Sequence, residues 1–147
     1  MSIWFKKVTP EDLNNLYMKT MVDHLGIEFL EIGDDYIKAR MPVDHRTKQP
    51  AGILHGGASV ALAETLGSMA ANLCVDRNRK MCVGLEINAN HIRQVRSGFV
   101  YGVAMPVHIG ATTQLWDIRI QNEKDKLVCI SRLTMAVLNQ GSIKEGS

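Results

Sequence analysis

One stretch near the middle of the chain, residues 57–75, constrains the fold more than any other. It has the length and the Ala, Leu and Met content of a helix, and no proline interrupts it. Apolar residues lie almost all round this helix rather than along one stripe, which is typical of a helix that is buried on most sides. The stretch is too short, and too often interrupted by polar residues, to span a bilayer. We therefore expect the chain to fold around it.

Glu64 is the only ionisable acid inside this stretch. A carboxylate in the middle of a buried helix costs free energy of desolvation unless a partner compensates it. One interpretation is a glutamate that reaches solvent or a buried basic partner, which is the usual case for a helix glutamate. The other is a catalytic carboxylate, because acids with perturbed pKa values cluster at active sites.

Residues at the start of the helix favour the catalytic interpretation. His55, Gly56 and Gly57 stand where unpaired backbone N–H groups and the positive end of the helix dipole favour an oxygen that carries negative charge. Glycine at this place lets a ligand approach the backbone without a Cβ in the way. An oxyanion site, a histidine donor beside it and a lone acid together indicate acyl chemistry.

These residues also carry a family resemblance. The pattern Gln49-x5-His55-Gly56-Gly57-x6-Glu64, followed by residues 84–93 (GLEINANHIR), resembles the hotdog-fold acyl-CoA thioesterases. More narrowly, it is similar to the 4-hydroxybenzoyl-CoA thioesterase branch, in which the catalytic glutamate lies on the central helix. The resemblance runs from about residue 26 to residue 138. Its motifs identify the branch well and the acyl group poorly.

Length, charge and cysteine usage agree with an intracellular enzyme of one domain. A chain of 147 residues is expected to form a single domain, 1–147, with a real hydrophobic core. The net charge of +2, with acids and bases interspersed, is too small to predict a nucleic-acid surface. Cys74, Cys82 and Cys129 lie in apolar segments and are predicted to be buried free thiols of a reducing compartment. With no cleavable leader and no long apolar run, we expect a cytoplasmic protein and no membrane partner.

The remaining sequence predicts one short helix and six strands. Thr9-Pro10-Glu11-Asp12 is a helix start, and apolar residues at helical spacing predict an amphipathic helix over about 10–21. Alternation of apolar and polar residues between turn signals predicts the strands at 27–32, 36–42, 81–93, 98–108, 112–121 and 127–138. The segment 44–52 is a predicted loop that leads into the central helix, and residues 139–147 are expected to be a flexible tail.

This order of elements predicts an α+β architecture, in which an antiparallel β-sheet wraps around a long central helix. It matches the hotdog fold that the resemblance implies. A single layer of sheet leaves one side of the helix and the sheet edge exposed, which predicts at least a homodimer. Because relatives in this branch are tetramers, we expect a homotetramer.

The resemblance implies a catalytic set of Gln49, His55, Gly56 and Glu64. The Gly56 N–H would hold the carbonyl oxygen, on which thioester hydrolysis builds negative charge. His55 would add a second hydrogen bond, or would only cap the helix. Glu64 would act as a nucleophile that gives an anhydride intermediate, or as a base toward water, and Gln49 would position the attacking group. The sequence does not separate the two roles of Glu64.

The resemblance also implies contacts with the substrate, of which coenzyme A is a part, so no separate cofactor is expected. Ser68 lies one turn beyond Glu64 and would orient it, contact the acyl group or bond its own backbone. Arg93 can bind a phosphate, and Arg96 is a further candidate. Predicted to line the acyl pocket are Leu54, Leu62, Met69 and Leu73. The predicted substrate contacts are Ser68, Met69, Val83, Asn90, His91, Ile92, Arg93, Val107, His108, Ile109, Gly110, Ala111 and Thr112.

Other functions are weighed against thioester hydrolysis. No metal is expected, because the histidines are scattered and neither C-x-x-C nor H-E-x-x-H occurs. A serine hydrolase is disfavoured because G-x-S-x-G is absent. A hotdog acyl-thioester dehydratase or hydratase and a non-catalytic acyl-CoA-binding protein stay open. For the thioesterase, the substrate is an aromatic or short- to medium-chain acyl thioester of coenzyme A or of acyl carrier protein.

Spacing along the helix predicts active sites that two subunits share. Glu64 lies seven residues after Gly57, which is about two turns or ~10 Å along the axis. A glutamate side chain reaches back over only part of this distance. The attacking acid must come within about 3–3.5 Å of a carbonyl whose oxygen sits on the Gly56 N–H. We therefore expect two central helices antiparallel across a dimer axis, with each site built from both chains.

Overall fold

The computed structural model describes residues 1–141. Of the tail predicted at 139–147, residues 142–147 lie outside the described residues, and Asn139 belongs to a strand. The elements, in chain order, are α1 (Pro10–Leu16), α2 (Met21–His24), β1 (Glu28–Ile32), β2 (Ile37–Pro42), α3 (Gly56–Leu73), β3 (Lys80–His91), β4 (Phe99–Ile109), β5 (Thr113–Gln121) and β6 (Leu127–Asn139). The central helix and all six predicted strands are confirmed, with ends that shift by one or two residues.

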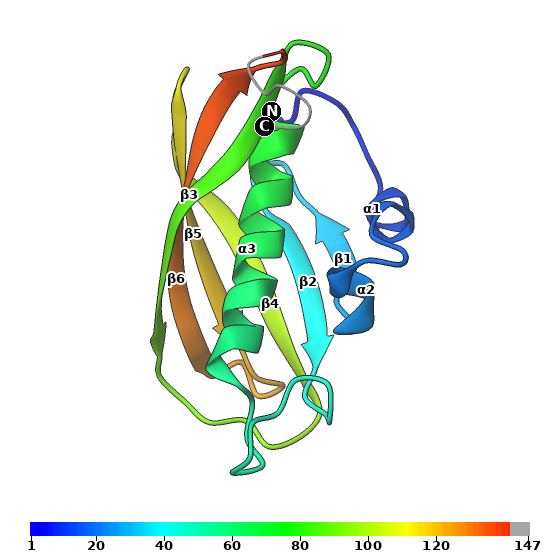
Figure 1. Ribbon diagram of the computed structural model, residues 1–147, viewed down its shortest axis with the longest axis vertical. Coiled ribbons are helices and arrows are strands. Elements are labelled where there is room, and N and C mark those ends of the chain that lie inside the picture. The colour runs from blue at the N-terminus through cyan, green and yellow to red at the C-terminus, as the bar shows by residue number, and fades with distance from the viewer. Residues whose placement is uncertain (142–147) are drawn as a thin grey trace.

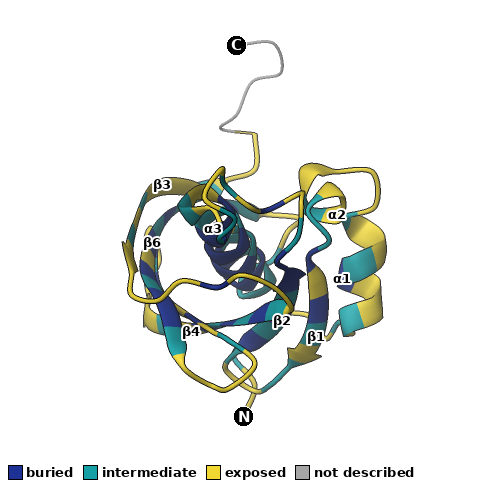
Figure 2. Cartoon of the chain, turned by 90° about the horizontal axis from the view of Figure 1, so that it is seen from below, coloured by how far each residue is buried: buried dark blue, intermediate teal, exposed yellow. Residues whose placement is uncertain are grey.

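The six strands form one antiparallel sheet in the order β1-β2-β4-β5-β6-β3. This sheet curves around α3, and the buried residues lie on the helix and on the inner face of the strands (Figure 1, Figure 2). Within residues 1–141, no strand covers the remaining side of α3 (Figure 1). The predicted architecture, an antiparallel sheet wrapped around a long helix, is thus confirmed.

Close packing of α3 on the sheet depends on small residues at the contact. A Cβ added to Gly67 would lie 2.7 Å from Leu133 Cδ2, and one on Gly102 would lie 2.7 Å from Leu66 Cδ1. Leu62 and Leu66 are completely buried. Each such leucine contributes about 1.5–3 kcal/mol by leaving water. Close approach at the glycines and burial of the leucines therefore hold α3 against the inner face of the sheet.

The N-terminal region differs from the prediction of one helix over 10–21. α1 ends at Leu16, Lys19 adopts a φ of 61°, and α2 begins only at Met21. A residue other than glycine in this left-handed region cannot continue a right-handed helix. Of the residues in α1, only Leu13 is buried. The predicted start is confirmed, because Thr9 and Asp12 form a reciprocal capping box.

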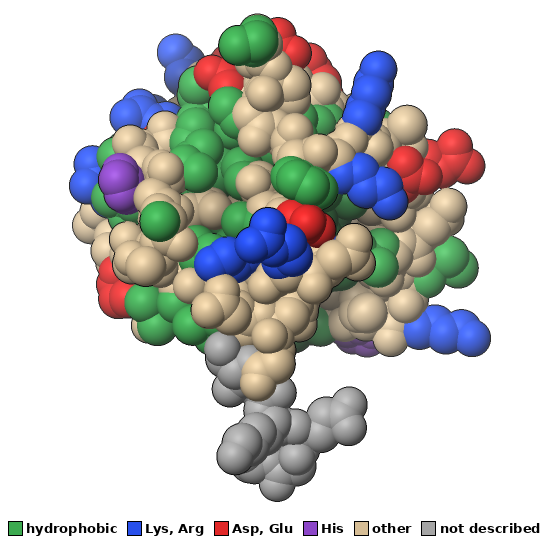
Figure 3. All heavy atoms as spheres, turned by 90° about the horizontal axis from the view of Figure 1, so that it is seen from above, with side chains coloured by type: hydrophobic (Ala, Val, Ile, Leu, Met, Phe, Trp, Pro, Cys, Tyr) green, Lys and Arg blue, Asp and Glu red, His purple; other side chains and the backbone are tan. Residues whose placement is uncertain are grey.

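The surface carries charges of both signs. Figure 3, which views the end of the molecule where α3 ends, shows acidic and basic side chains interspersed with hydrophobic ones. Within residues 1–141, no helix has both the length and the apolar content needed to cross a membrane. The same residues hold no cluster of three or more His, Cys, Asp or Glu side chains that would suit a metal ion.

Candidate active site

A cavity of about 410 Å³ opens beside the first turn of α3. It brings together predicted residues from three separate segments, namely Gln49, Leu54, Gly56, His91, Ile92 and Arg93. The prediction did not include Ile53, Ser59, Gln94 and Val128, which also line the cavity. Ser59 could have been predicted to line the same cavity as Gly56, because it follows Gly56 by three residues and residues at this spacing share one face of a helix.

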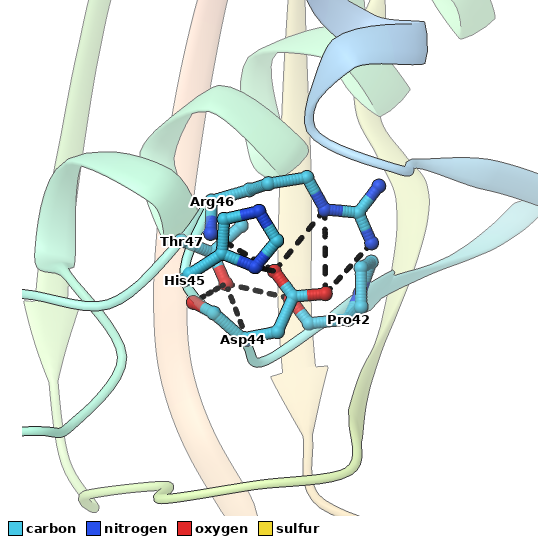
Figure 4. Close-up of polar contacts among 5 residues, drawn as sticks. All are labelled: Pro42, Asp44, His45, Arg46 and Thr47. Carbon is cyan, nitrogen blue, oxygen red and sulfur yellow. Dashed lines mark hydrogen bonds and ion pairs between the residues drawn. The ribbon is translucent and has the colours of Figure 1, made fainter.

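The loop before α3 is held by a compact turn, shown in Figure 4. The Thr47 hydroxyl donates to the Pro42 carbonyl oxygen at 2.7 Å, and Arg46 Nη2 lies 2.7 Å from Asp44 Oδ2. Hydrogen bonds from Arg46 hold the pKa of the Asp44 carboxyl down at about 2. The Thr47 carbonyl then accepts the His55 N–H at 2.8 Å. This turn therefore fixes where α3 begins.

Gly56 and His91 meet at the start of the helix. A Cβ added to Gly56 would lie 2.8 Å from His91 Nε2, so only glycine leaves room for the imidazole. Among the described residues, the Gly56 N–H has no hydrogen-bond acceptor. A free amide at the positive end of an 18-residue helix, in a cavity wall, is a donor available to a ligand oxygen.

His55 caps α3 and lies outside this cavity. Its Nδ1 accepts the Gly57 N–H at 2.8 Å. Because Nδ1 is the acceptor, the neutral ring carries its proton on Nε2, which is free to donate. The side chain lines a second, mainly apolar cavity of about 280 Å³, together with Met21, Leu25 and Ala61. The capping interpretation of His55 is confirmed, whereas its role as a donor to substrate stays a prediction.

Glu64 is exposed in the single chain, which corrects the prediction of a buried acid. Its side chain reaches solvent, so the chain alone does not impose a desolvation cost on the carboxylate. The carboxylate rests over β3, since a Cβ added to Gly84 would lie 3.0 Å from Glu64 Oε1. Eight residues, or about 12 Å along the axis, separate it from Gly56. One chain therefore does not bring the two groups together.

The other predicted contacts divide between the two ends of β3. Asn90 and His91 lie at its C-terminal end, beside the start of α3. Val83 lies at its N-terminal end and pairs with Ala136, which in turn pairs with Thr113 at the start of β5. The β4–β5 hairpin, with residues 107–112, is therefore at the Glu64 end of the strand (Figure 1).

Of the four residues predicted to line the acyl pocket, only Leu54 lies in the wall of the cavity beside the first turn of α3. Leu62 and Met69 are buried in the hydrophobic core, and Leu73 packs against that core. Ser68 is half-buried, and its carbonyl accepts a hydrogen bond from Asn72 at 2.9 Å. Arg93 is exposed, and its Nη1 donates to the Leu127 carbonyl oxygen at 2.9 Å.

The three cysteines are free thiols. Cys82 and Cys129 are buried as predicted, whereas Cys74 is only half-buried. Desolvation raises the pKa of the Cys74 thiol to about 12 and also raises the pKa values of the other two. Thiols with raised pKa values remain protonated near neutral pH and are poor nucleophiles. The carboxylate of Glu64 is therefore a better candidate for acyl chemistry than any cysteine of the chain.

Known proteins resemble the chain over nearly all of its length. A 1,4-dihydroxy-2-naphthoyl-CoA hydrolase of Escherichia coli is 55% identical over 92% of this chain and 99% of that protein. A proofreading thioesterase, EntH, of Cronobacter turicensis is 52% identical over 92% of this chain and 98% of its own. The crystal structure of thioesterase HI1161 from Haemophilus influenzae is 52% identical, covers 99% of both chains and superposes with a TM-score of 0.92.

The family model for the thioesterase superfamily matches residues 51–129, which include the start of α3, Glu64 and β3. Its agreement with whole-length relatives and with a thioesterase crystal structure confirms the hotdog fold and the hydrolysis of a thioester. The chain belongs to the thioesterase superfamily.

Proposed function

We propose that the protein hydrolyses an acyl-CoA thioester to a free acid and coenzyme A, with Glu64 as the nucleophile or the general base and the Gly56 amide as the oxyanion donor. The observation that carries this proposal is the Gly56 N–H, which has no acceptor within residues 1–141 and lies in the wall of the cavity at the start of α3. An aromatic acyl group is favoured, because one relative is named for a naphthoyl-CoA substrate. A short or medium aliphatic chain and acyl carrier protein as the carrier are the alternatives.

The chemistry follows from the two groups. The carbonyl oxygen of the thioester would accept the Gly56 N–H, and loss of one such donor typically costs about 10²–10³ in kcat. Glu64 would then add an oxygen to the carbonyl carbon, or would take a proton from water whose oxygen adds there. The carbon–sulfur bond breaks, and the thiolate of coenzyme A leaves and is protonated. In the first route one water then cleaves the anhydride, which releases the free acid and restores Glu64.

A homodimer would bring the two groups within reach. β3 is the last strand of the sheet, and its outer edge has no partner strand within residues 1–141. Leu85 on this strand is 61% exposed, which is unfavourable for a long free edge. Antiparallel pairing of two β3 strands about an axis near Ile87 would place the Gly84 end of one chain, with Glu64, beside the His91 end of the other. Each site would then hold Glu64 from one subunit and Gly56 from its partner.

A second contact between copies would complete a tetramer. Towards the end of β4, Met105, Val107 and Ile109 are 44%, 50% and 43% exposed. A bulge between Pro106 and His108 shifts the alternation of the strand, so these side chains do not share one face, but together they expose an apolar stripe along the end of β4. We propose that two dimers meet through this stripe as a homotetramer.

The free cysteines support a cytoplasmic location, since thiols persist in a reducing compartment.

Release of free thiol tests the proposed function. Benzoyl-CoA and a medium-chain acyl-CoA are each expected to give free thiol and free acid in equal amounts. The same protein is offered crotonyl-CoA, whose hydration a dehydratase-type hotdog enzyme would catalyse. Hydration of the enoyl-CoA without thiol release, or binding of acyl-CoA without any turnover, would contradict the proposal. Acyl carrier protein thioesters of the same acyl groups identify the carrier.

Arg93 is expected to bind a phosphate of coenzyme A. Arg93→Ala should raise KM for acyl-CoA with little change in kcat, because the lost ion pair binds substrate and transition state alike. The difference from the wild type should shrink as ionic strength rises, since salt screens exposed charges. Arg132→Ala removes an exposed arginine from the strand β6 and serves as the control. A KM that is unchanged at low salt would place the phosphates elsewhere.

A further inference from the structure

Asn72, near the end of α3, binds the backbone of the edge strand β3. Its Oδ1 accepts the Cys82 N–H at 2.9 Å, and its Nδ2 donates to the Cys82 carbonyl oxygen at 3.2 Å. The same amide donates to the Ser68 carbonyl at 2.9 Å and accepts from Arg77 Nη1 at 2.9 Å. An amide side chain offers two donors and two acceptor positions, so all four are used.

The Asn72–Cys82 contact lies on the outer edge of the sheet. Cys82 pairs with Val137 of β6. The Val137 N–H points away from β3 and donates to the Thr112 carbonyl oxygen at 2.9 Å. Cys82 and Val137 are therefore a non-hydrogen-bonded pair, and the Cys82 backbone groups point to the free edge. The Asn72 amide binds both of these groups in the way that a neighbouring strand would. The Asn72 amide therefore occupies the Cys82 backbone groups with which a further strand would pair.

The opposite edge of the sheet has a matching contact. Asn14 of α1 accepts the Phe29 N–H at 2.7 Å and donates to the Phe29 carbonyl oxygen at 3.1 Å. Phe29 belongs to β1, the other terminal strand. The two edges differ beyond these contacts, because the β3 edge continues from Cys82 to the exposed residues Gly84, which lies next to the Glu64 carboxylate, and Leu85.

We propose that Asn72 is a positioning residue for Glu64 and ends the part of the β3 edge with which a second copy of the chain pairs. Glu64, Ser68 and Asn72 follow at four-residue spacing and share one face of α3. The Asn72–Cys82 contact fixes α3 on β3. This contact lies two residues before Gly84, which is next to the Glu64 carboxylate. Backbone groups of alternate residues point the same way along a strand, so Gly84 is the first free pairing position. This inference rests on the proposed function, since it assigns the attack to Glu64.

Two variants of Asn72 test the proposal. Asn72→Asp keeps the shape and the acceptor but removes both donors, and Asn72→Ser no longer reaches Cys82. Each is expected to lower kcat for thiol release at least about tenfold and to change KM less than about twofold, because misplacing the acid affects the transition state. Amide hydrogen exchange at Cys82 should become at least about tenfold faster in the intact dimer, since no other group within residues 1–141 accepts a hydrogen bond from this N–H.

Asn14→Ser is the matched control, because it removes the same kind of contact from the other edge, and it should leave kcat and Cys82 exchange at wild-type values. Unchanged kcat in a folded Asn72 variant, or an equal loss in Asn14→Ser, would overturn the positioning role. Cys82 protection that persists in the Asn72 variants would show that the partner strand covers this position and would overturn the assigned edge. Absence of thiol release from the wild type would refute the proposed function instead, and the exchange measurement would still decide on the edge.

Discussion

Glu64→Ala is expected to lower kcat by at least about a hundredfold, the usual effect of losing a nucleophile or a base, while the variant still binds acyl-CoA. The side chain is exposed and lies over Gly84, so its removal leaves no cavity in the core. Stability should therefore change little, and the loss reports on the reaction. Thiol release under saturating acyl-CoA measures kcat, and titration calorimetry with a slowly hydrolysed acyl-CoA measures binding.

Two further variants sharpen this experiment. Glu64→Gln keeps the size of the side chain but removes the negative charge, and it should be as inactive as the alanine variant. Glu28→Ala removes an exposed glutamate from β1, at the far edge of the sheet, and should retain wild-type kcat. Near-normal turnover in either Glu64 variant would contradict the role of Glu64 as the nucleophile or the base of the reaction.

Mixing two inactive variants is expected to restore activity if the sites are shared. One variant is Glu64→Ala, and the other is Gln49→Ala combined with His91→Ala, whose side chains both line the main cavity. In a heterodimer, one site would combine the intact Glu64 of one chain with the intact cavity of its partner. The second site would carry every defect. After random reassortment in equal amounts, about a quarter of the sites should be intact in a two-fold symmetric dimer.

The control for this experiment mixes Glu64→Ala with Glu64→Gln, which should recover nothing, because no pairing restores the carboxylate. Heterodimers are verified by native mass spectrometry after brief denaturation and refolding. If Glu64 and the cavity act within one chain, every site stays damaged. Verified heterodimers without recovered thiol release would therefore refute the shared-site model.

Several features of the protein follow from local sequence. The length and apolar content of the central stretch predicted α3, and alternation predicted all six strands to within two residues. These patterns are local, since hydrogen bonding and burial of one face impose a period on consecutive residues. The sequence motif also pointed to Gln49, Gly56 and His91, and the structure places all three in one cavity wall.

Only the tertiary structure decided which side of α3 is covered. Apolar residues almost all round the helix predicted burial on most sides, but the pattern does not show where the sheet stops, and Glu64 is exposed beside the edge strand β3. Lys19 likewise breaks the predicted first helix through a backbone conformation that residue spacing does not reveal. Contacts such as His91 on Gly56 and Asn72 on Cys82 join distant segments. They depend on strand order, register and the curvature of the sheet, which packing of the whole chain determines and no local period encodes.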